Sequence, residues 1–331
     1  MSVLTPAPAR DSLRGPARVL LRQHRLLLRI AGGLALATVL GLFALALRSS
    51  HVAEVFEASN CPVDGSDGDR ACMQTARNYL DSMVTYRSIF QDVAVFLTVL
   101  PALFSAFVAG PLIARELESG TFRMSWTQSV SPARWLTAKL AVPTSLVLAG
   151  TAVLTATLRW AGSRTENPYP AEWYTWPVFA TTGTVPFASL LFGLCVGALA
   201  GLLIRRTVLA LAASASVTGA MITASAYLRG ELWPRRTVTG PSLDVRTNIW
   251  WVETGSVDSR GERLPPDLCS LPGTPEEWRR CMADHDVAGQ YLDFHPASHF
   301  WPIQLVETGI LLVLAALALA LAFRVLRRRH G

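Results

Sequence analysis

Long uncharged apolar runs alternate along this chain with short, densely charged segments. About 20 consecutive apolar residues are needed to cross the hydrocarbon core of a membrane as a helix, and soluble proteins rarely contain uncharged runs of this length. The pattern predicts an all-α integral membrane protein, a six-helix transmembrane bundle that forms a single domain over residues 1–331. The predicted spans lie at about 26–47, 93–114, 140–158, 178–204, 207–228 and 302–323.

The distribution of basic residues predicts how these spans are oriented. With the N-terminus inside, residues 1–29, 115–139, 205–206 and 324–331 are cytoplasmic, and they carry 16 basic residues against three acidic ones. Cytoplasmic loops carry the excess of Lys and Arg. The first apolar run is also too long for a signal peptide and lacks a small-residue cleavage site. We therefore expect an uncleaved anchor, both termini in the cytoplasm and a location in the plasma membrane.

Two regions on the predicted outer side, 48–88 and 229–301, are too long for simple turns, and each contains two cysteines. Even pairs on the oxidising side of a membrane indicate disulfides that close loops. Four cysteines allow three connectivities, and four unpaired thiols are the alternative. The candidates are Cys61 with Cys72 and Cys269 with Cys281, while Cys195 lies alone in the fourth span.

The second outer region contains histidines but no recognisable metal site. His285, His295 and His299 accompany Asp293, yet Pro296 separates the last two histidines and no established ligand spacing is met. We expect no metal. A short helix is predicted at 274–282, because Thr274 suits an N-cap and Pro275 suits the first helical position.

Aromatic residues gather where the fourth and sixth spans begin. We interpret them as anchors at the membrane interface, where Trp and Tyr are enriched, rather than as a binding site. They are Trp173, Tyr174, Trp176, Phe300 and Trp301.

Known catalytic signatures are missing from the sequence. Lys139 is the only lysine, and it has neither the glycine-rich turn nor the following Ser or Thr of a P-loop. No HExxH zinc motif and no GxSxG nucleophile elbow occurs. We therefore expect no catalytic residue, no cofactor on this chain and no nucleic-acid partner.

Residues 115–139 carry the most informative pattern. Residues 115–118 continue the second span, Gly120 permits the left-handed backbone that ends a helix, and Thr121 can cap a new one. Phe122 and Trp126 then form an apolar ridge at i and i+4. The third span begins at Ser131 and Pro132, an N-cap followed by a first-turn proline. The pattern predicts a short amphipathic helix between two turns at the cytoplasmic surface. The alternative is an interfacial helix that only anchors the loop.

Two features lie within the predicted spans. Gly193, Gly197 and Gly201 form a small-residue stripe, which lets helices approach closely. The stripe could face its own bundle, which we favour, or a second membrane subunit. Glu307 is an intramembrane acid and a functional candidate by default, although at this depth we expect it to reach the interface or to pair with Gln304.

The chain resembles a known family in two places. Residues 115–121 (RELESGT), 126–130 (WTQSV) and 134–139 (RWLTAK) look like the intracellular loop of actinobacterial ABC transporter permeases of the type-2 exporter class. The stretch 295–304 (HPASHFWPIQ) with 307–309 (ETG) is similar to the start of their last span. Related permeases often have Gln or Tyr where this chain has His295.

The resemblance implies that residues 115–139 contact a separate cytoplasmic ABC ATPase subunit, which binds ATP and Mg²⁺. It also implies that the permease works as a dimer with a second copy or a paralogue. Phe122 and Trp126 would be apolar anchors in a cleft of the ATPase, and charged or polar neighbours would pair with it or brace the helix ends. The residues concerned are Arg115, Glu116, Glu118, Gly120, Thr121, Phe122, Arg123, Trp126, Thr127, Gln128, Arg134 and Trp135.

Three other functions remain open. A secondary carrier or channel is disfavoured because no internal repeat and no chain of intramembrane acids and histidines is present. A membrane-embedded enzyme is disfavoured by the missing motifs. A membrane anchor or assembly protein without transport activity would use the outer regions to bind a partner.

Overall fold

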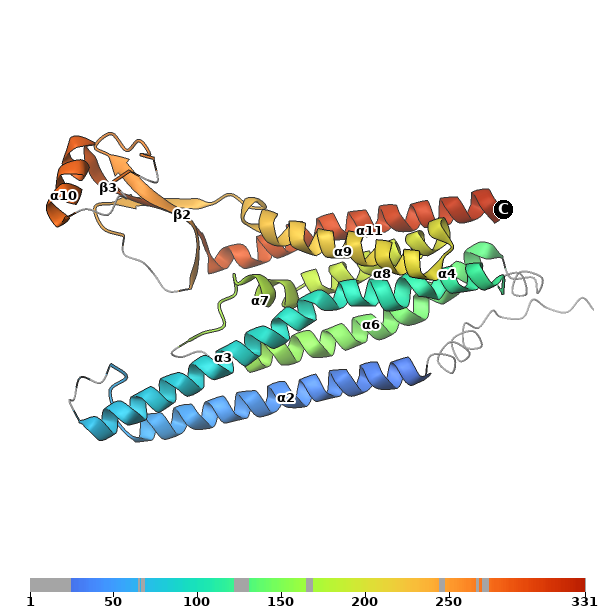
Figure 1. The fold of residues 1–331 in the computed structure, drawn as a ribbon, viewed down its shortest axis with the longest axis horizontal. Helices are drawn as coiled ribbons and strands as arrows, with labels where there is room; N and C mark the ends of the chain where they lie inside the picture. Colours follow the sequence, from blue (N-terminus) through green and yellow to red (C-terminus); the bar gives the residue numbers. More distant parts are fainter. Residues whose placement is uncertain are drawn as a thin grey trace, which may run out of the picture.

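The helices of the protein run side by side in an elongated bundle. A computed structural model describes residues 25–64, 66, 69–121, 131–164, 169–243, 248–265, 268–269 and 274–330. A small sheet lies at one end of the bundle and the C-terminus at the other (Figure 1). We call these the sheet end and the C-terminal end.

Within the described residues, six helical stretches are long and apolar enough to cross a membrane. The second of them consists of α3, a π-helical turn η1 and α4, which follow one another without a break. The elements of the bundle are α2 (Arg25–Ala58), α3 (Arg70–Phe104), η1 (Ser105–Ala109), α4 (Gly110–Ser119), α6 (Pro132–Gly162), α7 (Trp176–Thr181), α8 (Val185–Ile204), α9 (Thr207–Leu228) and α11 (Phe300–His330).

Helix α8 occupies the centre of the bundle. It is apolar or small on every side, as expected of a helix that is surrounded by others. It packs against α11, α9, α4 and η1, and 72% of its most apolar window is buried. Helix α2 lies at the periphery against α6 and α3, and only 11% of its window is buried (Figure 1).

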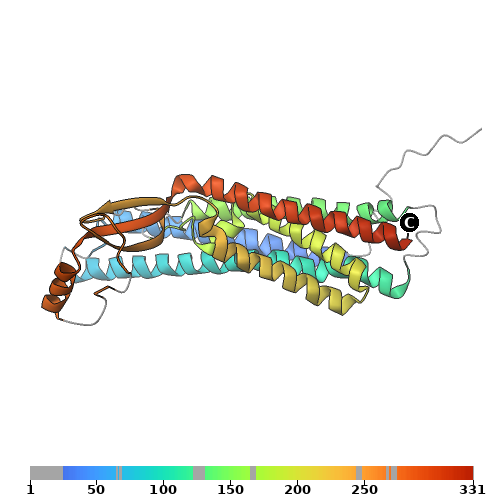
Figure 2. The same cartoon turned by 90° about the horizontal axis from the view of Figure 1, so that it is seen from above.

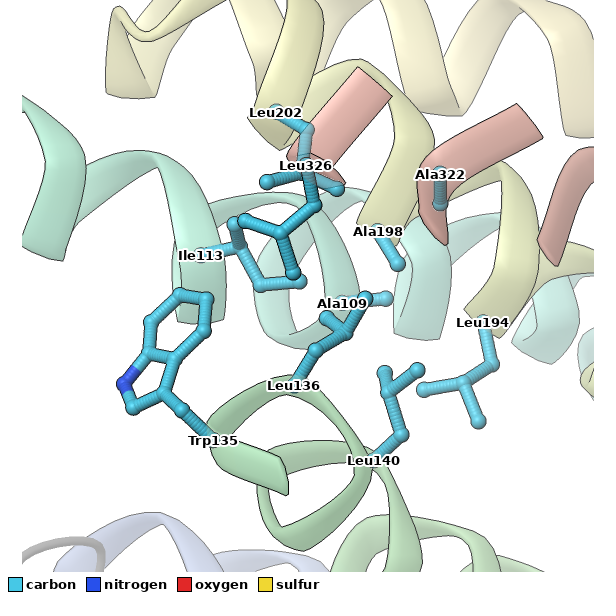
Figure 3. Close-up of a cluster of buried hydrophobic side chains, with 10 residues drawn as sticks. All are labelled: Ala109, Ile113, Trp135, Leu136, Leu140, Leu194, Ala198, Leu202, Ala322 and Leu326. Carbon is cyan, nitrogen blue, oxygen red and sulfur yellow. The ribbon is translucent and has the colours of Figure 1, made fainter. Parts of the chain in front are cut away.

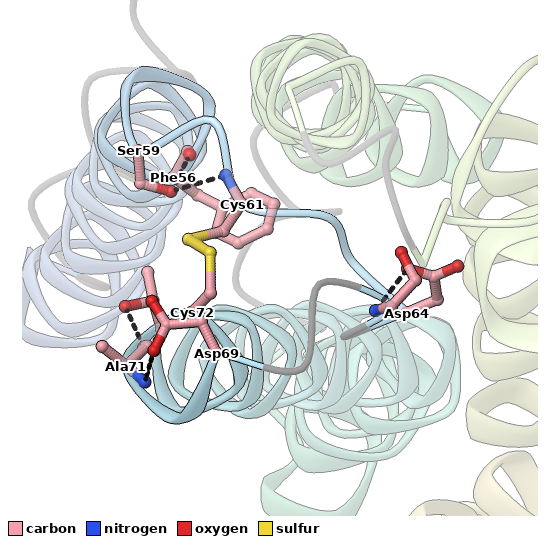
Figure 4. Close-up of a disulfide and its surroundings, with 9 residues drawn as sticks. Phe56, Ser59, Cys61, Asp64, Asp69, Ala71 and Cys72 are labelled. Atoms are coloured by element: carbon pink, nitrogen blue, oxygen red, sulfur yellow. Dashed lines mark hydrogen bonds between the residues drawn. A yellow bond between two sulfur atoms is a disulfide. The ribbon is translucent and has the colours of Figure 1, made fainter.

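The first predicted outer region is mostly helical. Helices α2 and α3 continue past the apolar runs and form a long hairpin at the sheet end (Figure 1). A disulfide joins Cys61 to Cys72 across the turn of this hairpin, and Asp69 caps α3 by accepting a hydrogen bond from the Ala71 amide (Figure 4). The ring of Phe56 stacks on Tyr79 below the turn.

The second predicted outer region contains a sheet that the sequence analysis did not predict. Three antiparallel strands lie in the order β1-β3-β2, so the protein is mostly rather than entirely helical. The strands are hidden in the sequence because exposed and half-buried positions do not alternate cleanly along β2. The bounds are β1 (Arg236–Gly240), β2 (Ile249–Asp258) and β3 (Val287–Pro296).

Helix α10 (Pro275–Asp284) projects from the sheet at the far end of the molecule (Figure 2). The side chain of Thr274 accepts from the Glu277 amide and the Glu277 carboxylate accepts from the Thr274 amide, which completes a capping box. A second disulfide, between Cys269 and Cys281, ties α10 to the chain that precedes it.

Asp293 joins β3 to both neighbouring segments. Its carboxylate accepts two hydrogen bonds from Arg263, at 2.8 and 2.9 Å, and one from Thr237 of β1 at 2.6 Å. Burial would raise the pKa of Asp293, but these hydrogen bonds outweigh it and hold the pKa below its ordinary value. A carboxyl group with a depressed pKa stabilises the folded state above its unfolded pKa of about 3.9, and this stability is lost as the pH falls through the folded pKa.

We therefore expect the sheet to lose stability on acidification below about pH 4. The measurement is the thermal unfolding of detergent-solubilised protein, followed by tryptophan fluorescence between about pH 5 and pH 3. In an Asp293→Asn variant the midpoint is lower at pH 5 and falls less on acidification. An equal fall in both proteins would contradict this role of Asp293.

Candidate functional site

The two helix ends that flank residues 122–130 are joined to each other at the C-terminal end. Glu116 of α4 forms an ion pair with Lys139 of α6, and it accepts a hydrogen bond from the indole Nε1–H of Trp135 at 3.2 Å. Lys139 and Glu116 are largely shielded, with 14% and 23% of their side chains exposed. One carboxylate thus holds two side chains of the neighbouring helix.

A buried apolar cluster lies directly behind this contact. Trp135 and Leu136 of α6 are 5% and 0% exposed, and they pack with residues of α4, α8 and α11 (Figure 3). The cluster consists of Ala109, Ile113, Trp135, Leu136, Leu140, Leu194, Ala198, Leu202, Ala322 and Leu326. Because four helices meet here, a displacement of α4 and α6 at this end would be passed to α8 and α11.

Glu118 connects α4 to the start of α9. Its Oε2 accepts from the backbone N–H of Thr207 at 2.9 Å and from the Thr207 hydroxyl at 2.5 Å. A carboxylate beside the first amides of a helix satisfies unpaired donors and the positive end of the helix dipole. Glu118 therefore acts as a cap supplied by another helix, at the turn formed by Arg205 and Arg206.

The remaining residues predicted for this segment divide into two groups. Gly120 has a φ of 72°, the left-handed conformation that ends α4, and the Ser131 side chain accepts from the Arg134 amide to begin α6. The hydroxyl groups of Ser119 and Thr121 are hydrogen-bonded at 3.0 Å, and Arg115 is exposed. Phe122, Arg123, Trp126, Thr127 and Gln128 lie outside the described residues.

The glycine stripe packs inside the chain. A Cβ atom at Gly197 would lie 2.5 Å from the Ala109 Cβ and 2.8 Å from the Gly110 nitrogen, and one at Gly193 would lie 2.9 Å from the Pro101 carbonyl oxygen. At Gly201 the nearest atom is the Gly110 carbonyl oxygen, also at 2.9 Å. Within this chain, the stripe therefore brings α8 against the backbone of α3, η1 and α4.

Ser105, at the start of η1, connects three helices at this crossing. Its hydroxyl donates to the Gly193 carbonyl at 2.8 Å and accepts from Thr218 at 3.1 Å, and its carbonyl accepts from Ser214 at 3.1 Å. A π-helical turn inserts an extra residue into a helix and often occurs at functional sites. Here it allows α3, α8 and α9 to share one buried polar contact.

Glu307 pairs with Arg229, not with Gln304. The Nε and Nη2 groups of Arg229 donate to the two carboxylate oxygens of Glu307 at 2.8 and 3.1 Å, and both side chains are buried. The guanidinium also lies 4.3 Å from the ring centroid of Phe179. A cavity of about 40 Å³ lies beside the pair. The expected pairing was wrong because Arg229 was assigned to the outer loop, whereas it points back into the bundle from the end of α9.

Gln304 instead satisfies a break in the fourth apolar run. Residues 182–184 separate α7 from α8, and Gly183 has a φ of 68°. The amide oxygen of Gln304 accepts from the Thr184 and Val185 amides at 3.0 Å, and its nitrogen donates to the Phe179 and Thr182 carbonyls. Backbone N–H and C=O groups that are freed by a helix break inside a bilayer must form hydrogen bonds with other parts of the protein. Here the Gln304 side chain supplies four such hydrogen bonds.

His295 has a structural place at the junction of the sheet and the bundle. It is fully buried, its Nε2–H donates to the Gly230 carbonyl at 3.0 Å, and its Nδ1 lies 3.0 Å from Nδ1 of His299. Burial lowers the pKa of His295, so the imidazole is neutral near neutral pH. Because the Gly230 carbonyl can only accept a hydrogen bond, the neutral imidazole of His295 carries its hydrogen on Nε2.

Only some of the aromatic residues at the span starts are exposed as anchors would be. Trp176 and Trp301 are 47% and 49% exposed. Trp173 instead makes edge-to-face contacts with Trp250 of β2 and with Phe300, so it helps attach the sheet to the bundle. The described residues contain no group of three His, Cys, Asp or Glu side chains that could hold a metal ion.

Four residues of the site were not singled out in the sequence. Ser105, Thr207 and Arg229 lie at helix crossings or helix ends. A buried carboxylate such as Glu307 needs a cation as its partner, and this requirement is the one signal in the sequence that could have indicated Arg229. Lys139 served in the sequence analysis only to exclude a P-loop.

The fold is that of a multi-pass membrane protein whose polar contacts join helices and form no catalytic cluster in the described part of the chain. Residues 32–229 match the family described as ABC-2 membrane transporter related, and the chain belongs to this family of membrane permeases. The match includes the 115–139 segment and the glycine stripe, and it ends before the sheet and α11. Comparison with curated proteins and with solved structures gives no match.

Proposed function

We propose that this chain is the membrane-spanning subunit of an ATP-driven exporter and that residues 115–139 couple it to a separate ABC ATPase. Membrane permeases of this family generally work with an ATPase partner. The observation that carries the proposal is the Glu116 contact with Lys139 and Trp135, because it joins the two helix ends on either side of residues 122–130.

This contact gives the segment a mechanical role. A force on residues 122–130 would reach α4 and α6 together rather than being absorbed by independent helix ends. From α4 it would pass through η1 and the glycine stripe to α8, and through Glu118 to α9. Closure of an ATPase dimer would thus shift packed helices as bodies, a transition that requires no chemistry on the permease.

The proposed orientation places the C-terminal end in the cytoplasm. The turn at Arg205 and Arg206 and the basic end of α11 lie at the C-terminal end of the molecule, so this orientation agrees with the positive-inside rule. Both disulfides lie at the opposite end, which suits the oxidising side of a plasma membrane. ATP and Mg²⁺ would be bound by the ATPase, and the exposed apolar faces of α2 and α9 would contact lipid and a second permease copy or paralogue.

A secondary carrier is the main competing function. Proton-coupled carriers need ionisable groups that can change partners or protonation within the membrane. Among the described residues of the bundle, the buried acid Glu307 is held by two hydrogen bonds from one arginine. This arrangement favours a structural role for the pair over a proton relay.

Replacing both Phe122 and Trp126 with aspartate is expected to abolish retention of the ATPase. Buried aromatic anchors commonly contribute at least about 2 kcal/mol each to an interface, and a combined loss of about 4 kcal/mol lowers the affinity roughly 1,000-fold. The measurement is co-purification, in mild detergent, of a tagged permease with the ABC ATPase encoded at the same locus. The unmodified permease and the double variant must both be monodisperse for this comparison.

The matched control is Trp278→Asp, which places the same charge at an exposed tryptophan of α10 at the sheet end. This variant is expected to retain the ATPase. Equal retention by the double variant, or no ATPase bound to the unmodified protein, would refute the coupling role and leave residues 115–139 as an interfacial linker.

A further inference from the structure

An open groove runs along the outside of the bundle between α2 and α3. Its volume is about 840 Å³, within the range of about 300–1,000 Å³ that pockets for small molecules have. It extends along α2 from Leu34 to Arg48 and along α3 from Val93 to Asp81. At 1.5 Å per residue, the α2 wall is about 21 Å long, somewhat more than half the thickness of a bilayer core.

Small side chains on α2 keep the groove open. Ala37, Gly41 and Ala44 recur at helical spacing along its wall, and a Cβ atom added to Gly41 would meet nothing within 4 Å. The part of the groove away from the sheet end is mostly apolar, with Leu45 of α2 and Ile89 of α3 among its lining residues; the hydroxyl of Thr38, which also lines it, donates to the Leu34 carbonyl at 2.9 Å. In a membrane protein, a mostly apolar groove of this length on the outside of the bundle can hold the acyl chain of a lipid.

The groove is polar at its sheet end. Arg48 and Asp81 both line this part and are exposed, and no ion pair joins either of them to another described residue. A cation and an anion that do not neutralise each other complement a headgroup that carries both charges. Arg48 can donate to a phosphate, and Asp81 can accept from an ammonium group.

Two hydroxyl groups beside Asp81 select the kind of cation. Ser82 donates its hydrogen to the Asn78 carbonyl at 2.8 Å, and Thr85 donates to the Asp81 carbonyl at 2.8 Å. With their hydrogens committed to the helix backbone, both oxygens can only accept from a ligand. A primary ammonium group has three N–H donors, whereas the quaternary ammonium of choline has none.

We propose that this groove binds a phospholipid with an ethanolamine headgroup from the leaflet at the sheet end. An acyl chain lies along Ala37, Gly41 and Ala44, the phosphate contacts Arg48, and the ammonium group donates to Asp81, Ser82 and Thr85. The site is independent of the coupling segment, since it lies on the peripheral hairpin at the other end of the molecule.

The test is native mass spectrometry of delipidated protein in detergent, titrated separately with palmitoyl-oleoyl phosphatidylethanolamine, phosphatidylcholine and phosphatidylglycerol. The unmodified protein is expected to bind the ethanolamine lipid most tightly. Asp81→Asn lowers that affinity about tenfold and removes the preference over the choline lipid, because one charge-assisted hydrogen bond is lost. Arg48→Gln weakens binding of all three lipids.

Gly41→Phe and, separately, Ala37→Phe fill the apolar part and are expected to abolish binding of all three lipids while the thermal midpoint stays unchanged or rises. The control is Glu54→Gln with Arg77→Gln, which alters an exposed acid and an exposed base on the same hairpin outside the groove. Equal affinity of the unmodified protein for all three lipids would overturn the proposal. Lipid binding that persists in both phenylalanine variants would also overturn it. So would a lipid-free dimer of the unmodified protein that the Gly41→Phe substitution dissociates, because a second copy of the chain would then occupy the groove.

Discussion

Replacing Arg229 with leucine is expected to destabilise the protein by about 3–5 kcal/mol. The substitution leaves the carboxylate of Glu307 buried between α9 and α11 without its bidentate partner, and a lone buried charge is costly. It also removes the cation that lies over the Phe179 ring. The measurement is the thermal midpoint and the yield of monodisperse protein in detergent, and we expect both to fall sharply.

The double variant Arg229→Leu with Glu307→Leu separates the cost of an unpaired charge from that of disturbed packing. Well-packed apolar residues often replace a buried ion pair without loss of stability. We therefore expect the double variant to be markedly more stable than Arg229→Leu alone. If both variants are equally unstable, the pair does not act as a unit, and shape rather than charge decides the stability of this crossing.

A leucine at Gly197 is expected to prevent folding of the bundle or to destabilise it by more than about 3 kcal/mol. The new Cβ would overlap the Ala109 Cβ at 2.5 Å and the backbone nitrogen of Gly110 at 2.8 Å. A backbone atom cannot rotate away, so α8 must move off η1 and α4 and disturb the apolar cluster that also holds α6 and α11. The readout is the fraction of membrane-inserted protein that remains monodisperse on gel filtration.

Gly219→Leu is the matched control for this substitution. Gly219 lies in α9, which is also a membrane-spanning helix, and a Cβ there meets nothing within 4 Å. We expect this variant to behave as the unmodified protein or better, because leucine favours a helix more than glycine does. Tolerance of leucine at Gly197 as well would mean that α8 and α4 are not in the close contact that the proposed coupling requires.

The parts of the fold that depend on local chemistry could be predicted from the sequence. Apolar runs mark the long helices, and the glycine spacing on α8 indicates a packing face. Gly120, Ser131 and Thr274 act at helix ends through backbone conformation and short-range hydrogen bonds, which a sequence displays directly. These features need no knowledge of which segments meet in space.

The parts that depend on distant partners could not be predicted. Arg229 and Glu307 are 78 residues apart, and nothing in the local sequence of either shows that they face each other. The break at Gly183 is satisfied by Gln304 from another helix, so the fourth run appeared continuous. The sheet was missed because β1 and β2 both pair with β3, which follows them only after α10.

The central claim, that residues 115–139 face the cytoplasm and contact an ATPase, is tested most directly by site-specific cross-linking in native membranes. A single free cysteine is placed either at Thr127 or, as a control, at Arg260, which is exposed at the sheet end; Cys195, buried in α8, is replaced by alanine, and the two disulfides are kept. We predict that Thr127→Cys cross-links to the co-expressed ABC ATPase and is protected from a membrane-impermeant thiol reagent in intact cells. Arg260→Cys should show the reverse on both counts. Labelling of Thr127→Cys from outside, or a cross-link to the ATPase from Arg260→Cys, would contradict the account.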